Sequence, residues 1–541
     1  MGVTEERVTK QLTFARNASG LTRGLSLIDV FGMGIIDILP LYGIWFMFMA
    51  GLALFTGANL FISLGITAIT FGVASPIMWG VLGGSMPRSG GDYVYNSRIL
   101  HPSIALAASM GMILGQFYWN IYMATWITQP SLQMLGQFMG WPGLVNFAES
   151  KWGTFACAIV LYIVAFCMVG FSMRVFKAVQ RPILLISLLT TAICFLPMLF
   201  TSKGAFIANW NAAAAHYGSL NYSSFVAAAE KANGAAFPTT WNWGDTIGGF
   251  TAVFMLVIYA WCSVYVGGEV KKPSRSIMMA NALGGFVTVA LAFLFLFGAY
   301  HVAESKFLIA AAQTEYNGGL AGYNFPWASG VLGISFVASG FNRVIGILLS
   351  LTWLISTIAI FGVIMTYVSR VLFAWGMDRM GPKFFADVSH RYGTPIKALL
   401  FATVICGTFT AAYILWLQNA LTGLFASGLM LVTVFLVTAI SAIVFPYRKR
   451  VRGIWESSPF YGWRLARVPV ITIAGVVYLS YLVILIYYSF FNSKTRDVTG
   501  RSIFTFVAVW VIGVAWYFFW AWRSKKREID VGQSFEMLPP E

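Results

Sequence analysis

One aspartate, Asp37, lies in the middle of a long apolar stretch of the sequence. Residues 26–51 are almost entirely apolar, and nearly all other acidic residues lie at the ends of such stretches or between them. If the stretch crosses a membrane, a charge at its centre costs about 2.5–3.5 kcal/mol on insertion scales, so Asp37 is expected to face a cavity or a partner. No Lys or Arg occurs in the neighbouring deep segments. This pattern predicts a counter-ion for an ammonium group or a proton-coupling carboxyl. The alternative is a protonated or water-bridged structural aspartate at a helix break.

Other polar and aromatic residues in apolar stretches are weaker candidates. Gln116 and Asn120 lie one helical turn apart, where they either line a cavity or form hydrogen bonds between packed helices. Trp261 belongs to an aromatic group that either caps an ammonium group by cation–π attraction or serves packing and interfacial anchoring; the group consists of Trp241, Trp243, Tyr259, Trp261 and Tyr265.

The composition places these residues in a membrane protein. The chain has 541 residues, of which 58% are hydrophobic and 10% are charged, against about 45–50% and about 25% in soluble domains. Such a chain lacks the polar residues that a soluble surface needs. Soluble enzymes and disordered proteins are therefore excluded. The net charge of +16 comes from short loops rather than one patch, which excludes a nucleic-acid partner.

Twelve apolar stretches are long enough to cross a bilayer as helices. Their expected limits are 26–51, 56–86, 102–130, 153–172, 178–201, 245–268, 277–301, 343–374, 396–416, 420–446, 470–491 and 500–522. When Lys and Arg are counted in alternate loops, 27 of the 35 fall on one side. Because basic residues concentrate in cytoplasmic loops, both termini are expected in the cytoplasm of a multi-pass protein of the cell membrane.

The order of the stretches predicts two five-helix repeats of opposite topology, a common plan in transporters. We expect a cytoplasmic N-terminal tail (1–25), a first repeat (26–201), an external loop (202–244) and a second repeat (245–446). A cytoplasmic loop with helices 11 and 12 (447–522) and a cytoplasmic tail (523–541) follow.

Three loop motifs carry a resemblance to a known family. They read Pro87-Arg88-Ser89-Gly90-Gly91-Asp92-Tyr93-Val94-Tyr95, then Gly268-Glu269-Val270-Lys271-Lys272-Pro273-Ser274-Arg275, and then Ser369-Arg370-Val371-Leu372-Phe373-Ala374 with Asp378-Arg379-Met380-Gly381-Pro382 and Tyr392-Gly393-Thr394-Pro395. Each falls in a loop that the charge count makes cytoplasmic. Together they resemble motifs of the amino acid–polyamine–organocation permease family and anchor about residues 25–446.

The resemblance implies an all-α membrane fold of about 12 helices, with a 5+5 inverted repeat, two C-terminal helices, and helices 1 and 6 broken at mid-membrane. It also implies alternating access and transport of amino acids, polyamines or related organic amines. An unwound segment frees backbone groups that a ligand or ion must complete, because lipid offers no water to do so. The same resemblance makes Ser356 and Thr357 candidate sodium ligands, although such hydroxyls also bond to helix backbone.

The chain departs from the family pattern at both hinges. Aligned from Asp29, the Gly-x-Gly of the first helix falls on Pro40-Leu41-Tyr42. Proline has no N–H and frees the carbonyl of Ile36, so a break survives with different chemistry. In the sixth helix, Val257-Ile258-Tyr259-Ala260-Trp261 replaces a Phe-x-Gly hinge. An acidic Asp37 beside the break would repel a substrate carboxylate, which favours an amine without one or a cationic amino acid held differently.

These considerations predict a secondary active symporter or antiporter, not an enzyme, that needs no cofactor or metal and is driven by H⁺ or Na⁺. The expected partner is a small amine or amino acid. The expected substrate-binding residues are Gly34, Asp37, Pro40, Tyr42, Gly43, Gln116, Asn120, Tyr259, Trp261 and Ser263, and the ion-coupling candidates are Asp37, Ser356 and Thr357. The alternative is a permease-like protein that has lost transport and serves as a structural subunit, receptor or scaffold. The altered hinges favour that alternative, whereas the cost of keeping Asp37 in a structural bundle opposes it.

Overall fold

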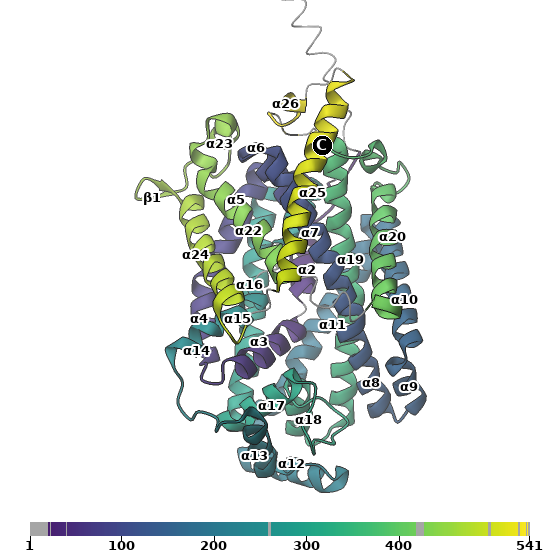
Figure 1. Ribbon diagram of the computed structural model, residues 1–541, viewed down its shortest axis with the longest axis vertical. Helices are drawn as coiled ribbons and strands as arrows, with labels where there is room; N and C mark the ends of the chain where they lie inside the picture. The colour runs from purple at the N-terminus through teal and green to yellow at the C-terminus, as the bar shows by residue number, and fades with distance from the viewer. Residues whose placement is uncertain are drawn as a thin grey trace, which may run out of the picture.

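The computed structural model is an elongated bundle of helices (Figure 1). It describes residues 20–538 except Thr22, Leu39, 258–260, 418–426, 496–498, 528–530 and Met537. Among the described residues, 11 helices are long and apolar enough to cross a membrane, or 12 if the bent pair Leu431–Tyr447 and Lys449–Glu456 forms one span. The expected all-α fold with about 12 membrane helices is confirmed.

The first five spans are built from eight α-helices and one π-helical turn. They are α2 (Leu27–Ile38), α3 (Pro40–Leu54), α4 (Leu60–Ile69), α5 (Phe71–Ser85), α7 (Pro102–Tyr122), η1 (Met123–Ile127), α8 (Thr128–Met139), α10 (Lys151–Gly170) and α11 (Met173–Phe200). Two short helices connect them, α6 (Asp92–Ile99) and α9 (Pro142–Glu149).

The later spans follow the same pattern. They are α14 (Trp243–Gly248), α15 (Phe250–Val257), the 3₁₀ helices η2 (Cys262–Tyr265) and η3 (Gly267–Glu269), α16 (Pro273–Val302), α19 (Arg343–Met377), α20 (Ile396–Ala412), the π-helical η5 (Tyr413–Leu417), α22 (Ser427–Val444), α24 (Val470–Phe491) and α25 (Gly500–Lys525). The connections contain η4 (Lys383–Ala386), η6 (Phe445–Tyr447), η7 (Lys449–Val451), α23 (Arg452–Glu456), the antiparallel pair β1 (Arg464–Leu465) and β2 (Val468–Pro469), and α26 (Val531–Ser534).

Local sequence signals set many helix starts. The side chains of Ser150, Ser172 and Asn342 each accept a hydrogen bond from a backbone N–H in the first turn of the helix that follows. Thr499 and Ser502 form a reciprocal capping box at the start of α25. These bonds satisfy N–H groups that have no partner within the helix.

The resemblance implies breaks in the first and sixth spans, and the described residues show a change of helix type only in the sixth. In the first, α2 ends at Ile38, α3 begins at Pro40, and together they make up the single span Leu27–Leu54; Leu39 lies outside the described residues, so the break expected there stays a prediction. In the sixth, α15 ends at Val257 and the chain resumes as the 3₁₀ helix η2. Tyr259, expected at this hinge, lies outside the described residues.

The two long connections form one lid at the end of the bundle opposite α26 (Figure 1). The lid comprises α12 (Lys203–Tyr217), α13 (Tyr222–Asn233), α17 (Ser305–Tyr316) and α18 (Val331–Ala338). Aromatic rings hold it together: the Tyr222 and Phe307 rings stack with centroids 4.4 Å apart, and Trp210 lies 4.8 Å from Phe307 and 4.8 Å from Phe325. We call this the lid end, and the end with α6 and the last turn of α25 the basic end.

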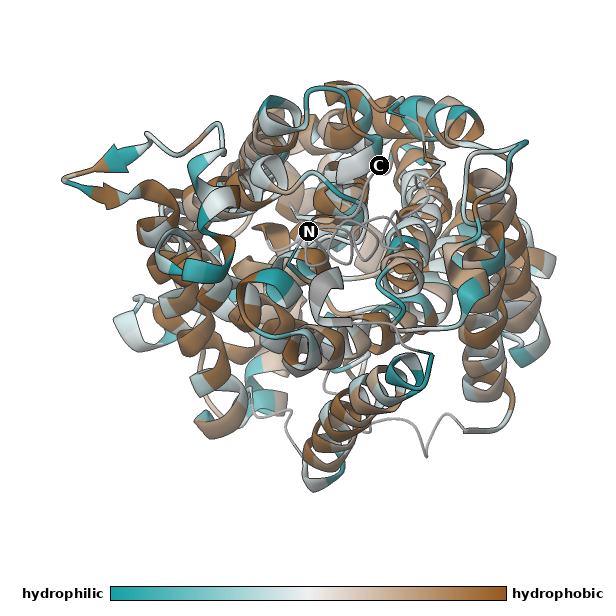
Figure 2. Cartoon of the chain, turned by 90° about the horizontal axis from the view of Figure 1, so that it is seen from above, coloured by the Kyte–Doolittle hydropathy of each residue, from teal (hydrophilic) through white to brown (hydrophobic). Residues whose placement is uncertain are grey.

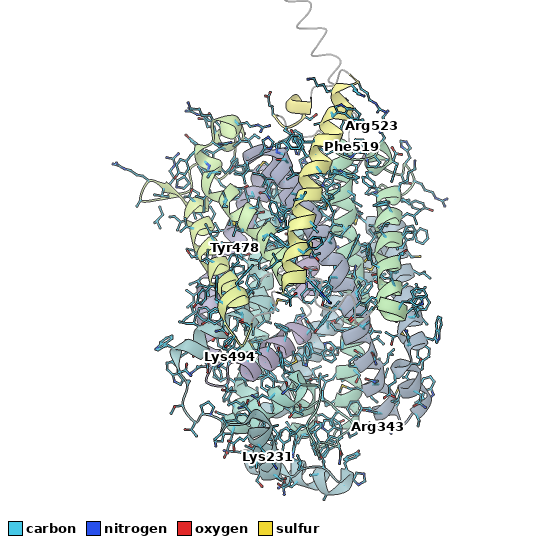
Figure 3. All side chains as sticks on the ribbon, in the orientation of Figure 1. Lys231, Arg343, Tyr478, Lys494, Phe519 and Arg523 are labelled. Atoms are coloured by element: carbon cyan, nitrogen blue, oxygen red, sulfur yellow. The ribbon has the colours of Figure 1, made fainter. Side chains whose placement is uncertain are left out.

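Charged residues separate between the two ends as the loop count predicts. Lys231 and Arg343 lie at the lid end, whereas Arg523 lies at the basic end (Figure 3). Ion pairs occur at both ends: Lys203 pairs with Glu304 at the lid end, and Arg370 pairs with Glu269 at the basic end. The arrangement agrees with the two sides of the expected topology, while the limits of the two repeats stay a prediction.

The perimeter of the bundle is apolar (Figure 2). Large side chains on the outer helices are exposed, among them Phe200 at 83%, Phe504 at 73% and Phe286 at 72%. Soluble proteins rarely expose so many large apolar residues together, and a lipid environment satisfies them. The exposed apolar helix surfaces and the length of the apolar helices describe a multi-pass membrane protein.

Glycines allow α5 and α16 to approach closely. A Cβ atom on Gly80 would lie 2.6 Å from the Met278 Cβ and 2.9 Å from its Cα, so the backbone itself would have to move. We expect Gly80→Ala to lower the melting temperature of the purified protein, because overpacking of this kind costs about 1–3 kcal/mol. Gly65→Ala is the control, since no described atom lies within 4 Å of its added Cβ. Equal melting temperatures for both variants would contradict the expectation.

Candidate functional site

The Asp37 carboxyl lies inside the bundle near the end of α2. Its residue is 4% exposed, and no basic side chain bonds to it among the described residues. The Tyr367 hydroxyl lies 3.1 Å from Oδ1, and Oδ2 has no hydrogen-bond partner in the described part of the chain. A buried polar atom without a partner is costly. Asp37 therefore presents one oxygen that a ligand or a proton could satisfy.

Tyr367 links Asp37 to a second predicted residue. Its hydroxyl, on α19, lies 3.1 Å from Asp37 Oδ1 and 3.0 Å from Gln116 Oε1 on α7. One hydroxyl hydrogen cannot serve both acceptors fully. Two arrangements resolve this: a protonated Asp37 donates to Tyr367, or the Gln116 amide is turned so that its NH₂ donates to Tyr367. We call Asp37, Gln116 and Tyr367 the central triad. The direction of the hydrogen bonds in the triad therefore depends on whether Asp37 is protonated.

The helix face that carries Asp37 borders open space. Gly34 lies one turn before Asp37 on the same face of α2 and is buried. No described atom lies within 4 Å of a Cβ built on Gly34. Gly43, in contrast, packs against α15, because its Cβ would lie 2.8 Å from the Leu256 Cδ2. The interior thus has room beside Gly34, whereas Gly43 serves helix contact.

One group of aromatic rings contacts the central triad at Tyr367, and a second group lies at the start of α3. Trp261 is fully buried, and its ring centroid lies 5.7 Å from that of Tyr367 and 5.0 Å from that of Tyr265. On the lid side, the Tyr42 ring lies 5.3 Å from Trp45 and 6.4 Å from Trp119. Ring faces of this kind attract cations. The setting combines an acid with aromatic walls.

The remaining predicted residues make protein contacts away from the Asp37 carboxyl. Asn120 donates to the Cys406 sulfur at 3.7 Å, and Ser263 donates to Asn281 at 2.8 Å. The Ser356 and Ser187 hydroxyls lie 2.7 Å apart, and Thr357 donates to the Trp353 carbonyl at 2.8 Å. Pro40 begins α3. The hydroxyls of Ser356 and Thr357 thus already make bonds within the protein.

Tyr367 was not among the residues expected from the sequence. It precedes the Ser369-Arg370 motif by two positions, and tyrosine is common in this chain. A regular α-helix brings residues four apart onto one face, so Tyr367 shares a face with Val363 and Val371 rather than with a polar stripe. Only the packing of α19 against α2 and α7 places its hydroxyl in the triad.

Two buried ion pairs fasten the basic end. Arg370 donates to both carboxylate oxygens of Glu269, at 2.8 and 3.1 Å, and both side chains are at most 1% exposed. The Glu269 carbonyl also accepts hydrogen bonds from the backbone of Gly24 and Leu25. Arg98 forms a second pair with Asp378. The motif residues therefore join the sixth span, the eighth span and the start of the first, and close the bundle at this end.

A buried acid on α6 supports the same closure. Asp92 accepts a hydrogen bond from the Tyr265 hydroxyl at the end of η2. Burial raises the pKa of Asp92 to about 7, although the hydrogen bond from Tyr265 acts in the opposite direction. Gly91 packs against the Tyr265 ring, since a Cβ added to Gly91 would lie 2.9 Å from that ring. The Gly-Gly motif thus lets α6 seat against the broken sixth span.

The lid closes the opposite end through a further acid, Glu315. The Trp45 indole on α3 donates to Glu315 Oε1 of α17 at 2.7 Å. The other Glu315 oxygen lies against Gly330, where an added Cβ would be 1.8 Å away. Asp37 is therefore enclosed from both ends.

Glu315 predicts a pH dependence. Burial raises its pKa from 4.5 to about 7, opposed by the Trp45 hydrogen bond. Between these two pH values the folded protein keeps a proton on Glu315 that the unfolded chain releases. The contribution of Glu315 to the free energy of unfolding is therefore fully present below pH 4.5 and is lost as pH rises to about 7. We expect Glu315→Gln to flatten the fall in melting temperature across this range.

Glu230→Gln is the control for this experiment. The hydrogen bond from Lys306 lowers the pKa of Glu230. The contribution of Glu230 to the free energy of unfolding is therefore lost only as pH falls below 4.5. If the melting temperatures of wild type and Glu315→Gln fall in parallel between pH 4.5 and about 7, Glu315 does not cause the pH dependence.

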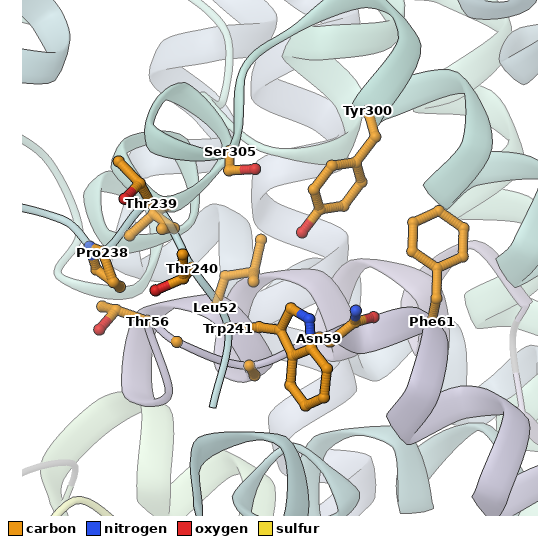
Figure 4. A pocket seen from close by; sticks show the side chains of 13 residues that line it. Leu52, Thr56, Asn59, Phe61, Pro238, Thr239, Thr240, Trp241, Tyr300 and Ser305 are labelled. Carbon is orange, nitrogen blue, oxygen red and sulfur yellow. The ribbon is translucent and has the colours of Figure 1, made fainter. Parts of the chain in front are cut away.

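A separate cavity of about 290 Å³ lies near the lid end, between the α3–α4 turn and the start of α17 (Figure 4). Its lining includes Thr56, Asn59, Trp241, Tyr300 and Ser305 and no charged side chain. None of the residues of the central triad lines it. This cavity lacks an acid for an ammonium group, so it is not the site centred on Asp37.

Comparison with solved structures identifies the fold. The chain is similar to MhsT, a structure titled as a complex with L-phenylalanine, with a TM-score of 0.53 and 13% identity. The match covers 84% of this chain and 98% of that one. At this identity the likeness concerns the fold alone. No curated protein matches the chain.

The family is shown by the sequence match. The family model for amino acid permeases matches residues 25–515, which is most of the chain. The match includes α2, α19 and the three loop motifs that form the buried closure. The chain therefore belongs to the amino acid permease family and is a membrane transporter of amino acids or related compounds, not an enzyme.

Proposed function

We propose that the protein is a secondary active transporter of an organic amine or a cationic amino acid, and that Asp37 binds the ammonium group of the substrate. The observation that carries the proposal is the buried Asp37 carboxyl, which has one unpartnered oxygen and no basic neighbour bonded to it among the described residues. An ammonium group supplies both the charge and the hydrogen-bond donors that this oxygen lacks. The open space beside Gly34 offers room for it.

The enclosure of Asp37 supports alternating access. Glu269–Arg370 and Arg98–Asp378 close the basic end, and Trp45–Glu315 closes the lid end. Transport requires each closure to open in turn while the other holds. The enclosed arrangement corresponds to an occluded state between the two open states.

A secondary transporter must also couple to an ion gradient. Asp37 is a proton-carrying candidate because the protonated carboxyl satisfies the triad through Tyr367. Sodium is the alternative, with Ser356 and Thr357 as candidate ligands. Uptake into proteoliposomes under an imposed proton gradient or an imposed sodium gradient separates the two.

The test compares amines with their parent amino acids. The melting temperature of purified protein is measured with putrescine and ornithine, and with tyramine and tyrosine, each pair differing only by a carboxylate. A ligand at 100 times its Kd stabilises the folded state by about 2.7 kcal/mol. We expect stabilisation by at least one of putrescine, tyramine and ornithine. Stabilisation by tyrosine with none by these three ligands would overturn the assignment to Asp37.

A further inference from the structure

The segment after α25 folds back onto the bundle. It contains α26 (Val531–Ser534) and Phe535, and it lies beside the last turns of α25 at the basic end (Figure 1). Ser534 and Phe535 are each 1% exposed, and Leu538 packs against the core.

The tail covers the Arg98–Asp378 pair. Arg98 on α6 donates to the two carboxylate oxygens of Asp378 at 2.6 and 2.8 Å. The Phe535 ring lies under the guanidinium, with its centroid 5.2 Å from Cζ, and the Ser534 carbonyl accepts a longer bond of 3.4 Å from the same group. The tail therefore supplies a ring face and an acceptor to a cation that is already paired.

The covered pair joins two elements that must separate when the basic end opens. α6 seats against the broken sixth span through the Asp92–Tyr265 hydrogen bond. Asp378 caps α19, the helix that carries Tyr367 and Arg370. Excluding water strengthens the attraction between the two charges. A seated Phe535 thus favours the closed basic end.

α25, the helix that precedes the tail, is fixed against the bundle. Its Trp516 indole donates to the Met380 carbonyl at 2.7 Å, two residues beyond Asp378. Gly513 allows α25 to pack on α7, because its Cβ would lie 2.4 Å from the Ala107 Cα. The tail is therefore presented to Arg98 from a fixed helix.

We propose that α26 and Phe535 form a C-terminal latch that stabilises the closed basic end by seating Phe535 on the Arg98–Asp378 pair. This inference rests on the proposed alternating access. Release of the latch increases opening at the basic end without changing the substrate site. The latch is a regulatory element, because a factor that withdraws the tail would speed substrate passage at this end.

A native cysteine reports the opening. Cys262, on η2 in the broken sixth span, is fully buried. In a variant whose Cys157, Cys167, Cys194 and Cys406 are replaced by Ser, a membrane-impermeant maleimide added at the basic end labels Cys262 only when that end opens. The rate of labelling is measured in wild-type and tail variants of this background in vesicles of known orientation.

We expect Phe535→Ala to raise the labelling rate about tenfold, the factor that corresponds to about 1.4 kcal/mol. Phe535→Trp keeps a ring over Arg98 and should label at the wild-type rate, whereas Phe535→Leu keeps apolar burial without the ring and should fall between. Glu536→Gln, at an exposed neighbouring position, is the matched control.

Equal rates for Phe535→Ala and Glu536→Gln would overturn the latch. If Phe535→Ala does not fold, the comparison of Phe535→Leu with Phe535→Trp decides, since equal rates for these two remove the role of the ring. Ligand binding by melting temperature is measured on the same samples. An amine that fails to bind the wild-type protein refutes the proposed substrate, whereas the labelling rates judge the latch independently of any substrate.

Discussion

Asp37→Asn is expected to weaken binding of the transported amine about tenfold to a hundredfold. The substitution keeps the size of the side chain and its bond to Tyr367 but removes the charge that faces the substrate. A hydrogen bond to a charged group contributes about 1.5–3 kcal/mol, and each 1.4 kcal/mol is about a factor of ten in affinity. The measurement is the Kd and the uptake rate of the amine identified by the melting-temperature screen, in proteoliposomes.

Two further variants make this result specific. Glu304→Gln removes one negative charge from an exposed position at the lid end and should leave the Kd unchanged. Tyr367→Phe keeps the Asp37 carboxyl but removes its hydrogen-bond partner, so we expect an altered pH dependence of uptake with binding largely retained. If Asp37→Asn binds and transports as wild type does across pH, Asp37 has only a structural role.

The second large effect concerns the buried Glu269–Arg370 pair. Glu269→Gln leaves a buried guanidinium without its counter-charge, which costs about 3–5 kcal/mol. The double variant Glu269→Gln with Arg370→Met removes both charges and should recover much of the lost stability, because the desolvation of Arg370 is no longer required. Denaturation of the purified protein measures the free energy of unfolding of the two variants against wild type.

The exposed pair Arg452–Glu456 is the matched control. Its side chains are 72% and 46% exposed, and such pairs contribute about 0–1 kcal/mol, so Glu456→Gln should hardly change stability. A double variant at least as unstable as Glu269→Gln would show that the two residues act independently. It would contradict the claim that the Glu269–Arg370 pair closes the basic end.

The fold was largely predictable from the sequence because lipid imposes strict rules. Each span needs a long apolar stretch, and basic residues mark one side, so the limits 26–51 and 470–491 lie close to the Leu27–Leu54 and Val470–Phe491 of the structure. Pro40, which cannot donate a helix hydrogen bond, predicts a break in the first helix. That break stays a prediction, because Leu39 lies outside the described residues and Leu27–Leu54 forms one span.

The candidate site was predictable only in part. Asp37 and Gln116 were found because polar groups in apolar stretches are costly, and the structure brings them together. Asn120, one turn from Gln116, instead bonds toward α20. Tyr367 and the partners of Arg98 and Arg370 were missed, because their contacts join residues more than 100 positions apart and depend on helix packing. Sequence periodicity assigns a residue to a helix face, not to its partner on another helix.

The most direct measurement of the central claim is an experimental structure of the protein with a bound amine. We expect density for the ligand beside Gly34, with its nitrogen within hydrogen-bond distance of Asp37 Oδ2 and the Tyr367 contact preserved. A ligand bound elsewhere, with Asp37 Oδ2 still unpartnered, or a ligand whose carboxylate rather than its amine lies nearest α2, would contradict the role of Asp37 in binding the amine.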